Sequence, residues 1–193
     1  MENKFVIETE RLILRHLQEG DAEDMYKNYC SKDKVTENLI WQTHPNLEAT
    51  KQYLQTVLED YAAGLADFRF GIVWKETNEV IGVIDYMKRR DFIYEIGWVL
   101  SDEYWGRGIM PEAAKETLQL VFDSGAVRIQ AKHFVGNEKS GRAMQKIGMT
   151  HEGTLRCFGQ DGHGRIRDAE MYSIINPKHT NQTTQNNKNE VKE

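Results

Sequence analysis

The alternation of apolar and polar residues divides the chain into short strands and a few amphipathic helices. Strand-like alternation, rich in β-branched and aromatic residues, occurs at residues 5–15, 68–75, 80–88 and 92–100. Short polar turns separate the last three segments, so we expect an antiparallel meander. Apolar stripes with helical spacing predict one helix that opens at residues 21–24 and a second that begins at the cap residue Asn46 and ends near Gly64.

The second half of the chain is predicted to contain a β-α-β unit. An apolar stripe from Met110 to Phe122 predicts a helix that ends at residues 123–125, and strand-like alternation returns at residues 127–135. The strands on either side of this helix should be parallel, with a right-handed crossover. A short helix over residues 137–149 and a final hairpin follow, with strands expected at residues 150–158 and 166–175.

One turn combines the features of an anion site. Gly106 and Gly108 lie directly before the helix that begins near Met110, and helix N-termini carry unpaired N–H groups and roughly half a positive charge. The alternative interpretation is a tight strand-to-helix connection in which glycine has only a steric role. Gly97, inside the preceding strand, predicts a β-bulge or a close backbone approach. The sequence has no P-loop motif and no dinucleotide-binding motif, which argues against both of those folds.

Length and composition fit one soluble domain. With 193 residues, 39% of them hydrophobic and 28% charged, we expect a single domain over residues 1–176 and a disordered polar tail over 177–193. The formal net charge of −5 argues against nucleic-acid binding and favours cationic partners. No apolar run approaches the ~20 residues that cross a bilayer, and the first residues lack an apolar signal segment. We therefore expect a cytoplasmic protein without membrane contact.

Cysteines and histidines show no spacing that is typical of a metal site, so no metal is expected. Cys30 and Cys157 are far apart in the sequence, and both are expected to be free thiols. Residues 35–45 show no clear period. They are compatible with a mobile loop over a pocket and equally with a packed connection.

Several short motifs occur together in a characteristic order. They are Thr9-Glu10-Arg11-Leu12-Ile13-Leu14-Arg15 with Asp21-Ala22, Glu95-Ile96-Gly97-Trp98, residues 105–113, Asn137-x-x-Ser140 with residues 146–149, and residues 152–156. In this order and spacing the chain resembles the GNAT superfamily of acetyl-CoA-dependent N-acetyltransferases, and most closely its RimJ/RimL-type branch. The resemblance implies an α/β (α+β) fold with about seven mostly antiparallel strands, about four helices, and parallel fourth and fifth strands that splay apart.

The resemblance also implies where acetyl-CoA would bind. The family's pyrophosphate contacts correspond to the backbone amides of Gly106, Arg107, Gly108, Ile109 and Met110. The pantetheine arm would pair with the backbone of the splayed strand at Val99 and Leu100, and would contact the side chain of Asn137. The chain departs from the family at Met110, which is bulkier than usual, and at Met144, where many members have a general-acid tyrosine.

Two side chains are candidates for proton transfer. Glu95, on the splayed strand, is the predicted general base, acting directly or through water; a surface carboxylate at a strand edge is the alternative. Ser140 is the predicted general acid, because it follows Asn137 on the helix that approaches the thioester sulfur in the family. Its alternative is an ordinary first-turn serine. The Val99 amide is the candidate donor to the carbonyl oxygen in the transition state.

Three aromatic residues, Trp41, Tyr86 and Trp98, are predicted to line the acceptor side, although large aromatic side chains are more often part of the core. The resemblance implies acetyl transfer to a protein or peptide N-terminal α-amine, as in ribosomal-protein acetylation, or to a related small-molecule amine. Two alternatives stay open. The net charge favours an aminoglycoside or polyamine acceptor, and Met144 favours a non-catalytic acyl-CoA sensor. A homodimer is also considered.

Overall fold

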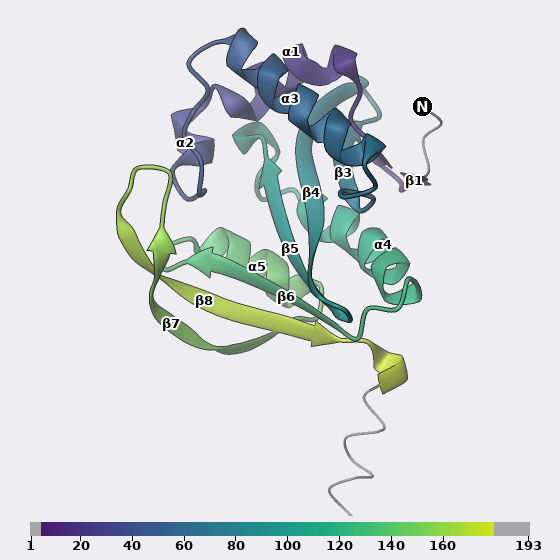
Figure 1. Ribbon diagram of the computed structural model, residues 1–193, viewed down its shortest axis with the longest axis vertical. Helices are drawn as coiled ribbons and strands as arrows, with labels where there is room; N and C mark the ends of the chain where they lie inside the picture. The colour runs from purple at the N-terminus through teal and green to yellow at the C-terminus, as the bar shows by residue number, and fades with distance from the viewer. Residues whose placement is uncertain (1–4, 180–193) are drawn as a thin grey trace, which may run out of the picture.

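Eight strands form one mixed sheet in the order β1-β2-β3-β4-β5-β6-β8-β7 in the computed structural model, which describes residues 5–179 (Figure 1). Neighbouring strands are antiparallel except for β5 and β6, which are parallel. The strands are β1 (Val6–Glu8), β2 (Leu12–Arg15), β3 (Arg69–Trp74), β4 (Glu79–Arg90), β5 (Ile93–Leu100), β6 (Arg128–Phe134), β7 (Thr150–Gln160) and β8 (Ile166–Ile175).

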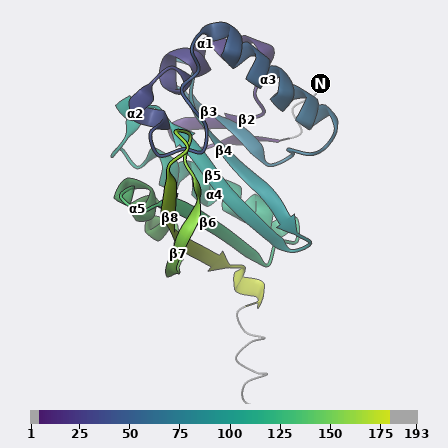
Figure 2. The ribbon, with the colours of Figure 1, turned by 60° about the vertical axis from the view of Figure 1, so that its left-hand side comes forward.

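Helices cover both faces of the sheet (Figures 1 and 2). The α-helices are α1 (Ala22–Met25), α2 (Asp33–Thr36), α3 (Leu47–Ala62), α4 (Ile109–Asp123) and α5 (Glu138–Lys146). Short 3₁₀ segments η1 (Glu19–Asp21) and η3 (Asp102–Tyr104) and a π-helical segment η2 (Tyr26–Cys30) complete the helical elements. Asn46 caps α3 as predicted, because its side-chain oxygen accepts a hydrogen bond from the N–H of Ala49 at 3.0 Å.

The alternation of side chains along the strands separates two cores, and in β4 it shifts by one residue at Ile81, which has no partner residue in β3. Ile72, Ile81 and Ile84 point to the face covered by α4 and α5, whereas Val73 and Val80 point to the face covered by α1, η2 and α3. Both sets are fully or almost fully buried. The sheet therefore has no solvent-exposed face along β3 and the first half of β4, and the site has to form elsewhere.

Two predicted features of the N-terminal half differ in detail. The single strand expected over residues 5–15 is two antiparallel strands, because the N–H of Thr9 bonds to the carbonyl of Leu12 and closes a turn at 3.0 Å. The sheet consequently has one strand more than expected. Of the two features that Gly97 was predicted to mark, the bulge is absent: Asp85 lies opposite Gly97, and the register of β4 with β5 shifts only between Lys88 and Arg90.

The C-terminal half matches the expected β-α-β unit and final hairpin. Residues 177–179, which were assigned to the tail, form one helical turn. The buried side chain of Asn176 holds this turn by donating to the carbonyl of Ala126 at 2.9 Å, and Lys178 forms an ion pair with Asp123 at 3.0 Å. The rest of the predicted disordered tail lies outside the described residues.

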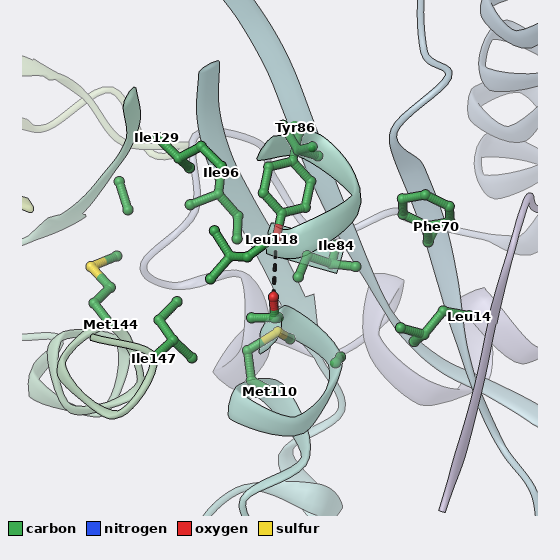
Figure 3. Packing of buried hydrophobic residues seen from close by; sticks show 14 of the residues in the cluster. Leu14, Phe70, Ile84, Tyr86, Ile96, Met110, Leu118, Ile129, Met144 and Ile147 are labelled. Atoms are coloured by element: carbon green, nitrogen blue, oxygen red, sulfur yellow. Dashed lines mark hydrogen bonds between the residues drawn. The ribbon is translucent and has the colours of Figure 1, made fainter. Parts of the chain in front are cut away.

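Tyr86 belongs to the core between the sheet and α4 (Figure 3). Its hydroxyl lies 2.8 Å from Thr117 Oγ1, and only 4% of the residue is exposed. Burial raises the pKa of this phenol far above its ordinary value, so it stays neutral. This position differs from the acceptor-lining position predicted for Tyr86.

Tyr86→Phe is therefore expected to change stability and not acceptor binding. Thr117 Oγ1 keeps its 2.9 Å bond to the carbonyl of Ala113, so the loss should be about 1 kcal/mol in the free energy of unfolding. Urea denaturation measures this loss. A KM for the amine acceptor that rises several-fold while stability is unchanged would contradict the core assignment.

Candidate active site

The parallel strands β5 and β6 part halfway along their length. Their pairing runs from Ile93 opposite Arg128 to Ile96 opposite Ala131, and it stops there. Beyond this point β5 continues beside β4 as far as Leu100, and β6 continues beside β8 as far as Phe134. Figure 1 shows the two strands diverging. The predicted splay of the parallel pair is thus confirmed, and Gly97 is the first residue after the parting.

Alternation of the ladder decides which backbone groups of β5 face the parting. The N–H of Ser101 donates to the carbonyl of Ile81 at 2.8 Å, in the same register that places Val99 opposite Val83. Antiparallel pairs alternate between bonded and non-bonded, so Val99 also bonds to β4. The carbonyl oxygen of Val99 agrees, since it lies 2.4 Å from where a Cβ on Gly82 would stand.

The prediction that the backbone of Val99 pairs with the pantetheine arm is therefore corrected: the backbone of Trp98 faces the parting instead. Trp98 and Leu100 direct their N–H and C=O groups away from β4, toward the parting. The carbonyl of Leu100 is already used, because the indole N–H of Trp105 donates to it at 2.9 Å. The free groups of this edge are the N–H of Leu100 and both groups of Trp98.

The turn before α4 presents a row of unpaired N–H groups. Gly106 and Gly108 have φ angles of 78° and 76°, in the left-handed region that favours glycine. Within the part of the chain that the structure describes, no hydrogen bond uses the N–H of any residue from 106 to 110. Met110 points its buried side chain into the core (Figure 3), so its bulk does not cover the row of amides. This arrangement can bind an anion.

Two ammonium groups lie over the ring of Trp105, the residue before this turn. Lys139 of α5 places Nζ 4.2 Å from the ring centroid, and Lys34 of α2 places Nζ 5.5 Å from it. Lys34 also bonds to Asp102 at 2.9 Å. Trp105 thus ties the turn to the end of β5 through its indole N–H, and its ring connects the turn to α2 and α5.

Asn137 and Ser140 lie at the start of α5. The side chain of Asn137 caps the helix by accepting a hydrogen bond from the N–H of Ser140, at 3.4 Å. The half-buried hydroxyl of Ser140 has no hydrogen-bond partner among the described residues, so it is available as a proton donor. Met144, at the position where the resemblance led us to expect a tyrosine in many family members, is 2% exposed within the core (Figure 3).

Glu95 lies on the face of β5 that points away from α4 and α5, in a cluster of polar side chains. Its carboxylate accepts hydrogen bonds from Lys132 at 2.8 Å, Gln130 at 2.9 Å and Arg89 at 3.0 Å. Burial alone would raise the pKa of Glu95, but these three donors outweigh it and hold the pKa below its ordinary value. A carboxylate with a lowered pKa and three donors is a weak general base.

The three predicted acceptor-lining residues are not brought together. Trp98 packs beside the core on the α4 side, as Tyr86 does, whereas Trp41 packs against the α3 side. The face of the sheet that carries Glu95 also carries two residues that the sequence analysis missed. They are Lys132, 18% exposed, and Phe158, whose ring lies 4.4 Å from the Lys132 ammonium. Phe158 comes from an irregular part of β7, a position that periodicity cannot predict.

The segment of residues 35–45 is a packed connection in this structure. The N–H of Gly162, in the β7–β8 hairpin, donates to the carbonyl of Leu39 at 2.9 Å, and Arg167 donates to Asn38 at 3.1 Å. At the other end, the N–H of His44 donates to the carbonyl of Cys30 at 2.9 Å. Figures 1 and 2 both show the hairpin tip beside this segment. Of the two interpretations, these contacts favour the packed connection.

Sequence and structure comparisons identify the class of protein. A family model described as an acetyltransferase (GNAT) domain matches residues 11–150. The chain belongs to this family of N-acetyltransferases, as its motifs indicated. It is 31% identical over 176 residues to the uncharacterized N-acetyltransferase YoaA of Bacillus subtilis, covering 90% of this chain and 98% of YoaA.

Solved structures agree with this assignment. The ribosomal-protein-S5-alanine acetyltransferase from Vibrio fischeri superposes with a TM-score of 0.78 at 26% identity, covering 90% of this chain and 98% of that one. The microcin C7 self-immunity acetyltransferase MccE, solved with acetyl-CoA and AMP, shares the fold with a TM-score of 0.77 at 22% identity. The coverage is 86% of this chain and 93% of MccE.

Residues 5–179 contain no group of three or more histidine, cysteine, aspartate or glutamate side chains that could hold a metal ion. Within the same residues no helix combines the length and the apolar character needed to span a membrane.

The lowered pKa of Glu95 predicts a pH-dependent contribution to stability. The ionised form stabilises the fold above the unfolded pKa of about 4.5, and this contribution is lost as the pH falls through the lower folded pKa. Glu95→Gln should therefore be less stable than the unmodified chain at pH 7, and the difference should narrow below about pH 4.5. Urea denaturation at pH 7 and below about pH 4.5 measures this difference in stability. Glu48→Gln, at an exposed position, is the control. A difference that widens in acid would contradict the assignment.

Proposed function

We propose that this chain transfers an acetyl group from acetyl-CoA to a primary amine, with a protein or peptide N-terminal α-amine as the acceptor. The observation that supports this most strongly is the parting of β5 from β6 beside a turn whose N–H groups at residues 106–110 are unpaired. One feature offers strand-edge groups to an extended amide chain, and the other offers donors to a diphosphate. A ribosomal-protein acceptor would place the reaction in the cytoplasm.

The residues present fit acetyl-CoA, which would supply the activated acetyl group as a thioester. The amides of residues 106–110 would hold its pyrophosphate, the free backbone groups of Trp98 and Leu100 would pair with its pantetheine arm, and the side chain of Asn137 would contact the same arm. These groups bind and orient the thioester. Since α4 and α5 cover one face of the sheet, we place the acceptor on the other face, where Glu95, Lys132 and Phe158 lie.

The chemical step needs a neutral amine and a proton for the leaving thiolate. The amine nitrogen forms a bond to the acyl carbon, the carbon–sulfur bond breaks, and Ser140 Oγ–H donates a proton to sulfur. The proton released by the amine passes to solvent, and Ser140 regains one from solvent. Of the two free backbone N–H groups at the parting, those of Trp98 and Leu100, the one that does not pair with the pantetheine arm replaces Val99 as the candidate donor to the carbonyl oxygen in the transition state.

The state of Glu95 favours an α-amine over a lysine side chain. Neutralising an amine with a pKa near 7.8 costs about 1 kcal/mol at pH 7, whereas a pKa near 10.4 costs about 4.6 kcal/mol. A carboxylate bound by Lys132, Gln130 and Arg89 gives little help with the larger cost. The same pairing disfavours a polyamine or aminoglycoside, because Glu95 already has two cationic partners.

A panel of acceptors tests the proposed function directly. We would measure release of the CoA thiol from acetyl-CoA with a lysine-free peptide that has a free N-terminus, an N-terminally blocked peptide with one lysine, spermidine and an aminoglycoside. Turnover with the first peptide only is the expected result. Acetyl-CoA binding without turnover on any acceptor would support the non-catalytic sensor, and turnover restricted to the polycations would overturn the α-amine assignment.

Ser140→Ala is expected to lower kcat by about 10²-fold, which is typical of a lost general acid, with little change in acetyl-CoA affinity. Ser124→Ala is the matched control, because Ser124 caps the C-terminal end of α4, outside the site, and its hydroxyl donates to the carbonyl of Val121 at 2.7 Å. Single-turnover kinetics and calorimetry separate the two effects. A kcat within twofold of the unmodified chain would remove Ser140 from the mechanism.

Glu95→Gln is expected to keep the shape of the pH–rate profile. If the acceptor amine supplies the acidic limb, the midpoint should stay near the amine pKa in the variant, and activity should recover toward pH 9. Rates from pH 6 to 9 with an N-terminal peptide measure this. Loss of the acidic limb in the variant would show that Glu95 acts in proton transfer after all, whereas inactivity at every pH would show that Glu95 holds the strand or the acceptor in place.

A further inference from the structure

The first turn of α4 is held by a cluster from the opposite end of the sequence. The carboxylate of Glu112 accepts hydrogen bonds from Thr9 Oγ1 at 2.5 Å, the N–H of Arg11 at 3.1 Å, and Arg11 Nε at 2.7 Å. Arg11 Nη2 lies 2.5 Å from the same carboxylate. Thr9 and Arg11 belong to the turn between β1 and β2, so this turn is attached to α4 by four contacts to one side chain.

Arg11 also contacts the turn at residues 106–108, whose unpaired N–H groups make it the proposed anion-binding turn. Its Nη1 donates to the carbonyl of Arg107 at 3.0 Å, and its Nη2 lies 3.8 Å from the position of a Cβ on Gly108. Arg107 stands between two glycines in left-handed conformations, so the peptide units around it have unusual rotational freedom. The bond from Arg11 orients the carbonyl of Arg107 toward the β1–β2 turn.

The charges of this cluster also matter for an anion at the helix N-terminus. Glu112 lies in the first turn of α4, close to the unpaired N–H groups, and an uncompensated carboxylate there would repel a second anion. Arg11 compensates it with a pair of contacts from a planar guanidinium. Lys75, the residue after β3, supports the arrangement, since its Nζ donates to the carbonyl of Thr9 at 2.7 Å and its N–H to the carbonyl of Arg11 at 3.0 Å.

We propose that Arg11 is a positioning residue for the pyrophosphate of the acyl donor: it fixes the turn at residues 106–108 and neutralises Glu112, without contacting the reacting atoms. This inference rests on the proposed function, because it takes acetyl-CoA as the ligand of the turn. It assigns a role to the motif at residues 9–15, which lies about 100 residues before the turn that it orders.

Arg11→Met tests this role. The variant should bind acetyl-CoA about tenfold more weakly, since it loses charge-assisted hydrogen bonds at the turn, while kcat at saturating acetyl-CoA stays within twofold. S-acetylpantetheine, which lacks the pyrophosphate, should be used with unchanged kcat/KM. Arg11→Lys keeps the charge but cannot reach both Glu112 and the carbonyl of Arg107, so it should show an intermediate loss.

Arg15→Met is the matched control. Arg15 is the last residue of β2, the strand that begins directly after Arg11, and it forms an ion pair with Asp21 at 2.7 Å, away from the turn. We expect Arg15→Met to change Tm about as much as Arg11→Met does but to leave the acetyl-CoA affinity unchanged. This result would separate general destabilisation from the loss of affinity caused by Arg11→Met. Unchanged affinity in Arg11→Met, or equal losses with acetyl-CoA and S-acetylpantetheine, would overturn the proposal; if Arg11→Met does not fold, Arg11→Lys is judged by the same criteria. Failure of the unmodified chain to bind acetyl-CoA would instead overturn the proposed function.

Discussion

The site depends on the loss of hydrogen bonding between β5 and β6 after Ile96 and Ala131. Each strand keeps its other neighbour, β4 for β5 and β8 for β6, so the sheet stays intact where the pair parts. The N–H and C=O of Trp98 and the N–H of Leu100 are left without a strand partner, and a polar group that is buried without a partner costs about 1–3 kcal/mol. A ligand with amide groups along an extended chain could satisfy them, which supports the proposal that the parting is a binding site.

The parting also explains why the two faces of β5 have different chemistry. Successive side chains alternate, so Ile96, Trp98 and Leu100 lie on the face of α4, whereas Glu95 and Val99 lie on the face of α3. Under the proposed function, a thioester between β5 and β6 would meet its binding turn on the first face and its acceptor on the second. The sequence predicts the alternation but not which face each set occupies, because that depends on the side of the sheet to which α4 returns. Tyr86 and Trp98 were placed on the acceptor side for this reason.

Local signals predicted most of the fold and the turn, and long-range contacts escaped them. Asn46 as a cap, the β-α-β unit and the glycines before α4 all depend on residues close together in the sequence. Whether Val99 or Trp98 directs its backbone N–H and C=O groups away from β4 depends on the register of β5 with β4. A shift of one residue would reverse the two roles. The partners of Glu95 come from β4 and β6, and those of Glu112 lie 101 and 103 residues away, so no spacing rule could reveal either set.

The partners of Glu95 and Glu112 make the charge at the site different from what the net charge of the chain suggested. An overall charge of −5 favours cationic ligands in general, but it says nothing about the charge at the site. Here Glu95, beside the parting, is paired with Lys132 and Arg89, and Glu112, beside the anion-binding turn, is paired with Arg11. Neither carboxylate is free to repel a bound phosphate or to attract a polycation. The local balance therefore suits an anionic acyl donor on one face and, on the other, an acceptor whose amine becomes neutral at a cost of only about 1 kcal/mol at pH 7.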